Sequence, residues 1–261
     1  MWLRVGYWPN IRNPQTFNEK IAHRQLFVPH PLAPLLADKW RVRKYVTECG
    51  FAYILNEVYY VTDQPETIPF DDLPDKFVIK ANHGCGLNIF VPDKKLLDRE
   101  KTIKNCQKLL NLKYGKWRRN YELHYDDIPP LIMVERYIED KNYGFPLDYK
   151  FFCFHGVVHY IQVDFDRFTR HTRIIYDKEW KDTGIRYAFP RPLGKSISKP
   201  YNFNDMIVIA EKLSSGIDFC RVDLYNPAPD KIIFSEITLN PEGALGRFTP
   251  KEFDWLFGKL W

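Results

Sequence analysis

The stretch from Leu147 to Asp164 constrains the fold more than any other part of this sequence. Two apolar, strand-like segments, Leu147–Phe154 and Val157–Asp164, are separated only by His155-Gly156. So short a connection, containing glycine, is typical of a β-hairpin, because only antiparallel strands can be joined by a two-residue turn. The stretch therefore predicts long antiparallel strands, which favours an α+β fold over a parallel α/β fold.

Helices and further strands are expected on both sides of this hairpin. Thr16 and Glu19 have the spacing of a capping box, which predicts a helix that begins there and is ended by the prolines that follow. Asn204 is a suitable N-cap for a helix whose buried stripe has helical spacing. Other helices are expected at about 37–49 and 96–112, with the capped one near 204–214, and other strands at 77–80, 89–91, 131–138, 219–225 and 232–237.

Composition excludes several classes of protein. Hydrophobic residues make up 45% and charged residues 27% of the 261 positions, which excludes a disordered chain, a collagen-like fibre and a coiled coil. The net charge of +5 is spread along the chain, so we expect no nucleic-acid partner. No apolar run of 18 residues and no signal peptide is visible, and the five cysteines are scattered without a Cys-x-x-Cys motif. We therefore expect a cytoplasmic protein.

Two acidic residues interrupt apolar strands near the C-terminus. Asp223 lies within one predicted strand and Glu236 within the next. A buried carboxylate is costly unless another group compensates for its charge, and two carboxylates on adjacent strands can hold Mg²⁺. On pattern alone, both residues could equally face solvent.

A lysine and a glycine-containing turn form a second candidate. Lys80 ends the strand at 77–80 and is followed by the turn Ala81–Asn88, which contains His83, Gly84 and Gly86. Backbone amides of such a turn can cradle phosphate oxygens while a lysine supplies positive charge. The chain has no Walker A motif, and an ordinary hairpin turn is the alternative.

Three more patterns are open to two interpretations each. Glu135 closes a strand that leads into a polar loop, where backbone groups could meet an adenine edge or simply end the strand. Asp148 and Lys150 share one face of a strand, as ligand groups or as a surface ion pair. An arginine cluster could bind phosphate or carboxylate, or could be a solvated loop. Its members are Arg167, Arg170 and Arg173.

In their order along the chain, these residues resemble an ATP-grasp enzyme, and more closely the TupA-like ATP-grasp family, named for teichuronopeptide synthesis. The resemblance runs from about Pro14 to the C-terminus. Its segments are Pro14–Lys20, Ala37–Lys39, Phe77–Gly84, Asp148–Gly156, Arg221–Tyr225 and Glu236–Pro241. The family implies two α+β subdomains that clasp a nucleotide. It suggests a helical segment over 1–65, a lid subdomain over 66–140, and a metal-binding and substrate subdomain over 141–261.

The resemblance also implies roles for individual residues, with ATP and Mg²⁺ as cofactors. The phosphate contacts would be Lys39, Lys80 and the turn with His83, Gly84, Gly86 and Asn88. The adenine contacts would be Glu135, Arg136, Tyr137 and Ile138. Asp148 would contact the ribose, with Lys150 beside it.

Metal and substrate contacts follow from the same resemblance. Asp223 and Glu236 would hold Mg²⁺, but Thr238 stands where the family usually has a third ligand, an asparagine. Thr238, Asn240 or a water would complete the site. Arg221 would steady an acyl phosphate, and the substrate carboxylate would fall to Arg167 or Arg173.

Three functions are compatible with this reading. The first is an ATP-dependent carboxylate–amine ligase, joining an amine or amino acid to a uronic-acid-type carboxylate in capsule or other cell-surface polysaccharide synthesis. The second is a phosphotransferase acting on a sugar hydroxyl, with Asp164, Asp166 or His171 as general base. The third is a non-catalytic nucleotide- or glycan-binding module, which Thr238 favours. A peripheral contact with a membrane-bound polysaccharide assembly complex, at the inner face of the membrane, is left open.

Overall fold

The computed structural model describes residues 1–115, 122–140, 144–166 and 169–261, which form two compact units. Unit 1 combines Met1–His30 with Asp140–Trp261, and unit 2 is Pro31–Glu139. Both main sheets are antiparallel and carry helices, so the α+β expectation is confirmed. The compact units divide the chain after residue 30, within the helical segment expected over 1–65. The three-part domain division stays a prediction.

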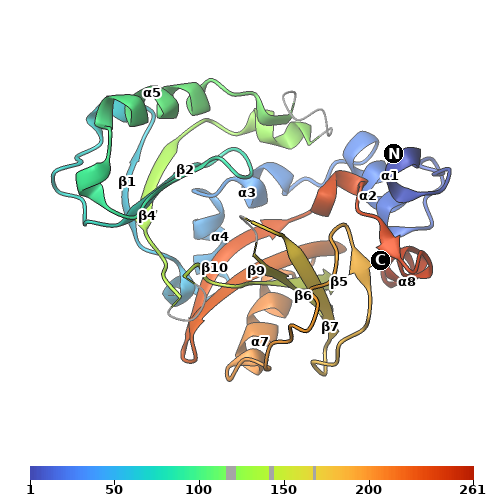
Figure 1. Ribbon diagram of the computed structural model, residues 1–261. Helices are drawn as coiled ribbons and strands as arrows, with labels where there is room; N and C mark the ends of the chain where they lie inside the picture. Colours follow the sequence, from blue (N-terminus) through green and yellow to red (C-terminus); the bar gives the residue numbers. More distant parts are fainter. Residues whose placement is uncertain (116–121, 141–143, 167–168) are drawn as a thin grey trace. The chain divides into compact units, whose positions relative to one another are not determined.

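Each unit has its own sheet (Figure 1). Unit 1 contains α1 (Trp2–Val5), α2 (Phe17–Leu26), β5 (Asp148–Phe154), β6 (Val157–Phe165), β7 (Thr172–Asp177), β8 (Arg186–Tyr187), α7 (Phe203–Leu213), β9 (Phe219–Ala228), β10 (Lys231–Thr238), η5 (Pro241–Ala244), β11 (Phe248–Thr249) and α8 (Glu252–Leu260). Unit 2 contains α3 (Ala33–Ala37), α4 (Val42–Glu48), η1 (Ala52–Ile54), β1 (Val58–Thr62), η2 (Pro65–Thr67), β2 (Phe77–Ala81), β3 (Asn88–Val91), η3 (Lys94–Leu96), α5 (Arg99–Leu110), η4 (Leu123–Asp127) and β4 (Ile132–Arg136).

The sheet of unit 1 has the strand order β10-β9-β5-β6-β7, and every neighbouring pair is antiparallel. The predicted hairpin between β5 and β6 is confirmed, and His155 and Gly156 both have positive φ, as a tight turn requires. Helix α7 packs on one face of this sheet. It buries a stripe with the predicted helical spacing, made of Met206, Ile209, Ala210 and Leu213.

The opposite face of the same sheet is divided into two halves. Residues two apart on a strand share a face, so Phe152 and Phe154 of β5 lie on the side of Asp148 and Lys150. Their half is covered by α2 and α8, whose Phe17 and Phe257 join them in one buried aromatic cluster. We call it the aromatic half. The remaining half carries polar side chains.

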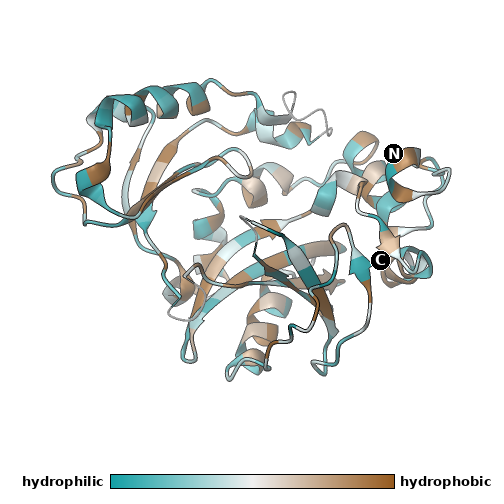
Figure 2. Cartoon of the chain, in the orientation of Figure 1, coloured by the Kyte–Doolittle hydropathy of each residue, from teal (hydrophilic) through white to brown (hydrophobic). Residues whose placement is uncertain are grey.

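Unit 2 is a smaller sheet, in the order β1-β4-β2-β3, with α5 packed against it. Phe77 and Ile79 of β2 and Ile132 and Val134 of β4 are fully buried, and Cys106 of α5 joins their cluster. In Figure 2, α5 is mostly hydrophilic, whereas β2 and β4 carry hydrophobic stretches. The predicted hairpin of β2 and β3 is confirmed.

The helix starts show where local chemistry decides. The capping box at the start of α2 is confirmed: Thr16 Oγ1 accepts a hydrogen bond from the Glu19 amide at 3.2 Å, and Glu19 Oε2 accepts one from the Thr16 amide at 3.0 Å. The helix expected from Ala37 begins only at Val42. Asp38 is extended, and its side chain accepts hydrogen bonds from the Trp40 and Arg41 amides.

Two other helix starts were wrong. Asp98 caps α5 by accepting from the Lys101 amide at 2.9 Å, so this helix begins at Arg99 rather than near residue 96. Helix α7 begins at Phe203, before the expected cap Asn204. Strands β1 and β7 and helix α8 were not predicted. None of the described helices is long and apolar enough to cross a membrane.

Candidate functional site

The polar half of the unit 1 sheet gathers most of the predicted site residues. Strand register puts Asp148 opposite Asp164, Lys150 opposite Asp223, and Asp223 opposite Glu236. We call this set of side chains the polar face. It consists of Asp148, Lys150, Gln162, Asp164, Arg173, Arg221, Asp223, Glu236 and Thr238, all on one side of five adjacent strands.

Asp223 is completely enclosed within the polar face. Its side chain is fully buried, and both of its oxygens accept hydrogen bonds at 2.7 Å from Arg221, from Nε to Oδ1 and from Nη2 to Oδ2. Burial alone would lower the pKa of Arg221, but the Asp223 carboxylate outweighs burial and holds that pKa above its ordinary value. Arg221 therefore keeps its positive charge in this bidentate pair.

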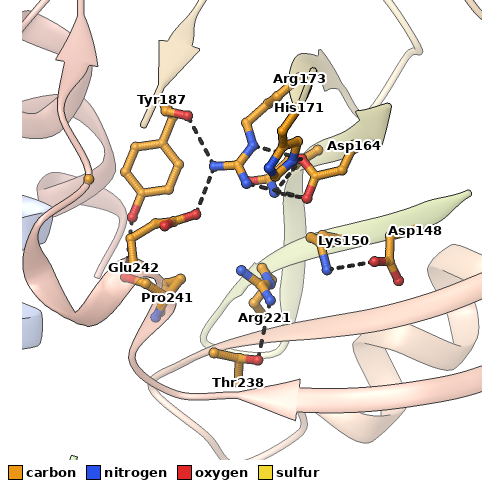
Figure 3. Close-up of polar contacts among 12 residues, drawn as sticks. Asp148, Lys150, Asp164, His171, Arg173, Tyr187, Arg221, Thr238, Pro241 and Glu242 are labelled. Atoms are coloured by element: carbon orange, nitrogen blue, oxygen red, sulfur yellow. Dashed lines mark hydrogen bonds and ion pairs between the residues drawn. The ribbon is translucent and has the colours of Figure 1, made fainter. Parts of the chain in front are cut away.

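Lys150 adds a second cation to Asp223. Its Nζ donates to Asp223 Oδ2 at 2.6 Å and lies 3.3 Å from Asp148 Oδ2, and its side chain is only 4% exposed (Figure 3). Asp148 and Lys150 therefore share one face, as expected, and their ion pair is buried rather than on the surface.

The other proposed metal ligands lie beside Arg221. Its Nη2 is 3.4 Å from Glu236 Oε1 and 3.3 Å from Thr238 Oγ1, and the Thr238 hydroxyl is 3.3 Å from Glu236. Asn240 follows β10, and within the described residues its buried Oδ1 has no hydrogen-bond partner.

These donors can be tested against Mg²⁺. Asp223, Glu236 and Thr238 offer only oxygen atoms, the ligands that Mg²⁺ prefers. The described residues contain no group of three His, Cys, Asp or Glu side chains placed to hold a metal. Mg²⁺ usually takes only one or two protein carboxylates and keeps several waters. The donor set therefore fits Mg²⁺, with the Asp223 oxygens shared with Lys150 and Arg221.

Arg173 was expected to hold a substrate carboxylate, but its donors are bonded within the chain. Nε bonds Asp164 Oδ1 at 2.7 Å, while Nη1 bonds Glu242 Oε1 at 2.9 Å and the Tyr187 carbonyl at 3.0 Å (Figure 3). The guanidinium is 2% exposed. Arg173 therefore positions two carboxylates. The alternative, Arg167, lies outside the described residues.

Asp164 is held on several sides. Burial would raise its pKa, but Arg173, His171 and Lys150 together bring that pKa far below its usual range. Gln162 Nε2 donates to both of its oxygens, at 3.1 and 3.2 Å. His171 Nε2 lies 3.4 Å from Asp164 Oδ1. Gln162 was missed in the sequence, although its alternation with Asp164 on an apolar strand was a usable signal.

Glu242 was also missed. It follows β10 in a turn where Glu242, Gly243 and Ala244 all have positive φ, of 55°, 57° and 63°. Such backbone is unusual for residues other than glycine, and it sets where the Glu242 side chain goes. That side chain is 25% exposed and bonds Arg173. The single glycine signals a turn but not this direction.

Unit 2 carries the predicted phosphate and adenine groups. Lys80 Nζ donates to Glu135 Oε2 at 2.7 Å, and Asn56 Nδ2 donates to the same oxygen at 3.3 Å. Burial would raise the pKa of Glu135, but Lys80 lowers it, and the net pKa is below the ordinary value. After the strand, Arg136 is exposed and Tyr137 and Ile138 are half-buried.

The turn after Lys80 is anchored at its start. Lys39 Nζ donates to the Gly84 carbonyl, and Asn82 joins Asp38 at 3.0 Å to the Leu131 amide at 2.7 Å. A Cβ at Gly84 would lie 2.7 Å from two neighbouring side chains, so glycine is required there. Gly86 has φ +73°, His83 is buried with a pKa lowered by burial, and Asn88 lies opposite Lys80 in the hairpin.

Comparison with known proteins now decides the family. The family model described as TupA-like ATPgrasp matches residues 19–261. The chain belongs to the TupA-like ATP-grasp family. The match spans nearly the whole chain and includes both units, so the resemblance read from the sequence is confirmed, and with it the ATP-grasp fold.

Solved ATP-grasp ligases are similar to this TupA-like chain at low identity. D-alanine–D-alanine ligase from Bacillus anthracis, complexed with ATP, is 14% identical with a TM-score of 0.48, over 87% of this chain and 63% of that one. L-amino acid ligase from Bacillus licheniformis is 13% identical with a TM-score of 0.48, over 87% and 49%. The ATP-grasp ligase PsnB, complexed with its minimal precursor, is 14% identical with a TM-score of 0.44, over 82% and 55%.

The TupA-like chain thus spans roughly half to two thirds of the length of these ligases. No curated protein sequence matches it significantly.

Proposed function

We propose that this TupA-like chain is an ATP-dependent ligase that joins a carboxylate to an amine through an acyl phosphate. The observation that carries the proposal is the polar face, where Arg221 bonds Asp223 and approaches Glu236. Acyl-phosphate chemistry needs groups that offset the charge on a transferring phosphoryl group, and it needs no nucleophilic side chain. On the polar face, Arg221 is the cationic group for this task, and Asp223 and Glu236 would hold the Mg²⁺ that adds positive charge.

Each predicted nucleotide and metal contact has a role in the proposal. Lys39 and Lys80 would contact the phosphates, the segment from Glu135 to Ile138 the adenine, and Asp148 the ribose. Lys80 is paired with Glu135, and Lys39 with the Gly84 carbonyl, so both ammonium groups have defined positions. Asp223 and Glu236 would hold Mg²⁺, with Thr238 or Asn240 beside them. When bound, Mg²⁺ would neutralise negative charge on the phosphates.

The proposed reaction has two steps. A substrate carboxylate oxygen attacks the γ-phosphorus of ATP, the bond from that phosphorus to the β-γ bridging oxygen breaks, and ADP leaves. An amine nitrogen then attacks the acyl carbon, the bond to the phosphate oxygen breaks, and inorganic phosphate leaves while the nitrogen loses a proton. Arg221 would stabilise the negative charge of the acyl phosphate, since its pKa stays high in this buried setting.

The proposal extends to the class of substrate. We propose a uronic-acid-type carboxylate and an amine or amino acid, in the synthesis of a cell-surface polysaccharide, because the family is named for such a product. Peripheral contact with a membrane-bound polysaccharide assembly complex would suit a lipid-linked acceptor. Trp2 and Trp8 are 53% and 81% exposed, Arg4 and Arg12 accompany them, and no acidic residue precedes Glu19.

Product analysis tests the reaction. The chain would be incubated with Mg-ATP and pairs drawn from a panel of uronic acids, amino acids and simple amines. We expect ADP, free phosphate and an amide in equal amounts, released only when both partners are present. Arg221→Lys, which cannot make the bidentate pair, should lose most of this activity. If no pair yields ADP and phosphate above the background of the two partners tested separately, the ligase proposal fails.

A sugar kinase is the second candidate, and one observation favours it. His171 Nε2 lies 3.4 Å from Asp164 Oδ1, so two of the three candidate bases lie next to each other. A kinase would transfer the γ-phosphate to the sugar and release ADP but no free phosphate. It would do so with no amine present. The same product analysis therefore separates the two reactions.

A further inference from the structure

Lys150 lies where a cation bound to Asp223 would have to compete with it. Its ammonium group is 2.6 Å from Asp223 Oδ2 and 3.3 Å from Asp148 Oδ2, and it is almost fully buried. We propose that Lys150 is a resident counter-ion of the metal site, which keeps divalent cations off Asp223 until a nucleotide arrives with them. This inference rests on the proposed Mg-nucleotide site, and it deepens that site by naming what controls metal entry.

Most acceptor positions on the Asp223 carboxylate are already used. An ionised carboxylate offers about four acceptor positions on its two oxygens. Arg221 uses one on each Asp223 oxygen, and Lys150 uses a second on Oδ2. That leaves one position, on Oδ1, so a metal ion alone would have to bind there beside two positive charges or displace one of the donors. Removing Lys150 frees its acceptor position on Asp223 Oδ2 without removing any metal ligand.

The net charge around Asp223 also depends on Lys150. The polar face together with Glu242 carries five carboxylates and three cationic side chains, so it has an excess of two negative charges. An apolar residue at position 150 would raise the excess to three and leave Asp148 and Asp223 without their shared cation. Both changes favour binding of a divalent ion, because opposite charges attract strongly where water is excluded.

A purely structural Lys150 would behave differently. Lys150 joins β5 to β9 through Asp223, so it could serve only to hold the two strands together. In that case its loss would lower the stability of the chain and leave its affinity for metal unchanged or weaker. Metal binding without nucleotide is therefore the measurement that separates the two roles.

The experiment is a titration of Mn²⁺, as a substitute for Mg²⁺, into nucleotide-free protein, with free Mn²⁺ counted by its EPR signal. The wild-type chain is compared with Lys150→Met, Lys150→Gln and Lys150→Arg. Lys178→Met is the matched control. It also removes a lysine and an ion pair, here with Glu211 of α7, but away from the polar face. We expect the two neutral variants at position 150 to bind Mn²⁺ about ten-fold more tightly or better. Lys150→Arg and Lys178→Met should stay close to wild type.

Equal or weaker Mn²⁺ binding by a folded neutral variant overturns the proposal. The wild-type chain supplies a second measurement that does not depend on the variants folding. Mn²⁺ alone should raise its unfolding temperature little, whereas Mn²⁺ with ADP should raise it clearly. If Mn²⁺ alone raises it as much as Mn²⁺ with ADP, Lys150 does not exclude the metal. The ligase proposal fails on different grounds, namely the absence of an amide product, so the two failures are distinguishable.

Discussion

The aromatic half and the polar half of the unit 1 sheet lie on the same strands, yet they solve opposite problems. On β5, Phe152 and Phe154 are buried under α2 and α8, while Lys150 two residues earlier bonds Asp223. On β9, Phe219 belongs to the aromatic half and Arg221 to the polar half. Hydrophobic burial stabilises the first half, whereas each charge in the second must be compensated by another charge.

This difference implies a division of labour along each strand. The aromatic rings pack edge to face, with Phe17 and Phe219 centroids 4.8 Å apart and nearly perpendicular. This cluster packs on the same strands, β5 and β9, from which Lys150, Arg221 and Asp223 project. We therefore expect changes in the aromatic half to act on stability, and changes in the polar half to act mainly on ligand binding.

The largest expected effect is that of Phe17→Ala. Phe17 is fully buried and contacts rings of β5, β9 and α8, so its loss should cost about 3–5 kcal/mol of unfolding free energy. Urea unfolding followed by tryptophan fluorescence measures it. The exposed Phe27, at 49%, gives the control Phe27→Ala, which should change stability far less. Equal losses in both variants would contradict the assignment of the core.

The next effect is the stabilisation by Mg-ADP. A ligand present at about 100 times its dissociation constant should add roughly 2.7 kcal/mol, seen as a rise in unfolding temperature. Asp223→Asn should remove most of this rise, because it takes away a proposed metal ligand. Asp230→Asn, in the exposed turn between β9 and β10, is a control for the same change of charge. A rise that survives intact in Asp223→Asn would place the nucleotide site elsewhere.

The polar face could be predicted from the sequence because strand periodicity carries most of its information. Alternation placed Asp148 with Lys150 and paired the strand of Asp223 with that of Glu236, and register confirms both. Arg173 could not be placed, because its strand β7 follows a polar segment and its partner Asp164 is on another strand. The sequence there reads equally well as a solvated loop.

Glu242 shows a second limit. Its direction depends on three successive residues with positive φ, and only one of them, Gly243, is a glycine. Propensity therefore gives no hint that Glu242 turns back to meet Arg173. The helix starts at Val42 and Arg99 were missed for a simpler reason. Asp38 and Asp98 accept hydrogen bonds from amides two or three residues ahead, so each helix begins later than the apolar pattern suggests.

Acid should weaken the polar face through Asp164. Its folded-state pKa lies far below the unfolded value, so the stability it contributes is complete above about pH 4–5 and declines as the pH falls toward the folded-state pKa. We expect Asp164→Asn to be less stable than wild type at neutral pH, with a gap that narrows as the pH is lowered. Chemical denaturation at several pH values measures the gap. A gap that is independent of pH would mean that Asp164 is not held ionised by Arg173.

The smallest expected effect concerns the edge of the aromatic half. Thr16 caps α2 and also bonds Tyr7 through its hydroxyl at 2.6 Å. Thr16→Ala should cost about 1 kcal/mol, because one helix amide loses its acceptor while Phe17 stays packed. Thr16→Ser keeps the hydroxyl and should restore most of that loss. Mg-ADP should stabilise both variants as much as wild type, since α2 supports the aromatic half alone. A smaller Mg-ADP effect in Thr16→Ala would show that the two halves are energetically coupled along the strands they share.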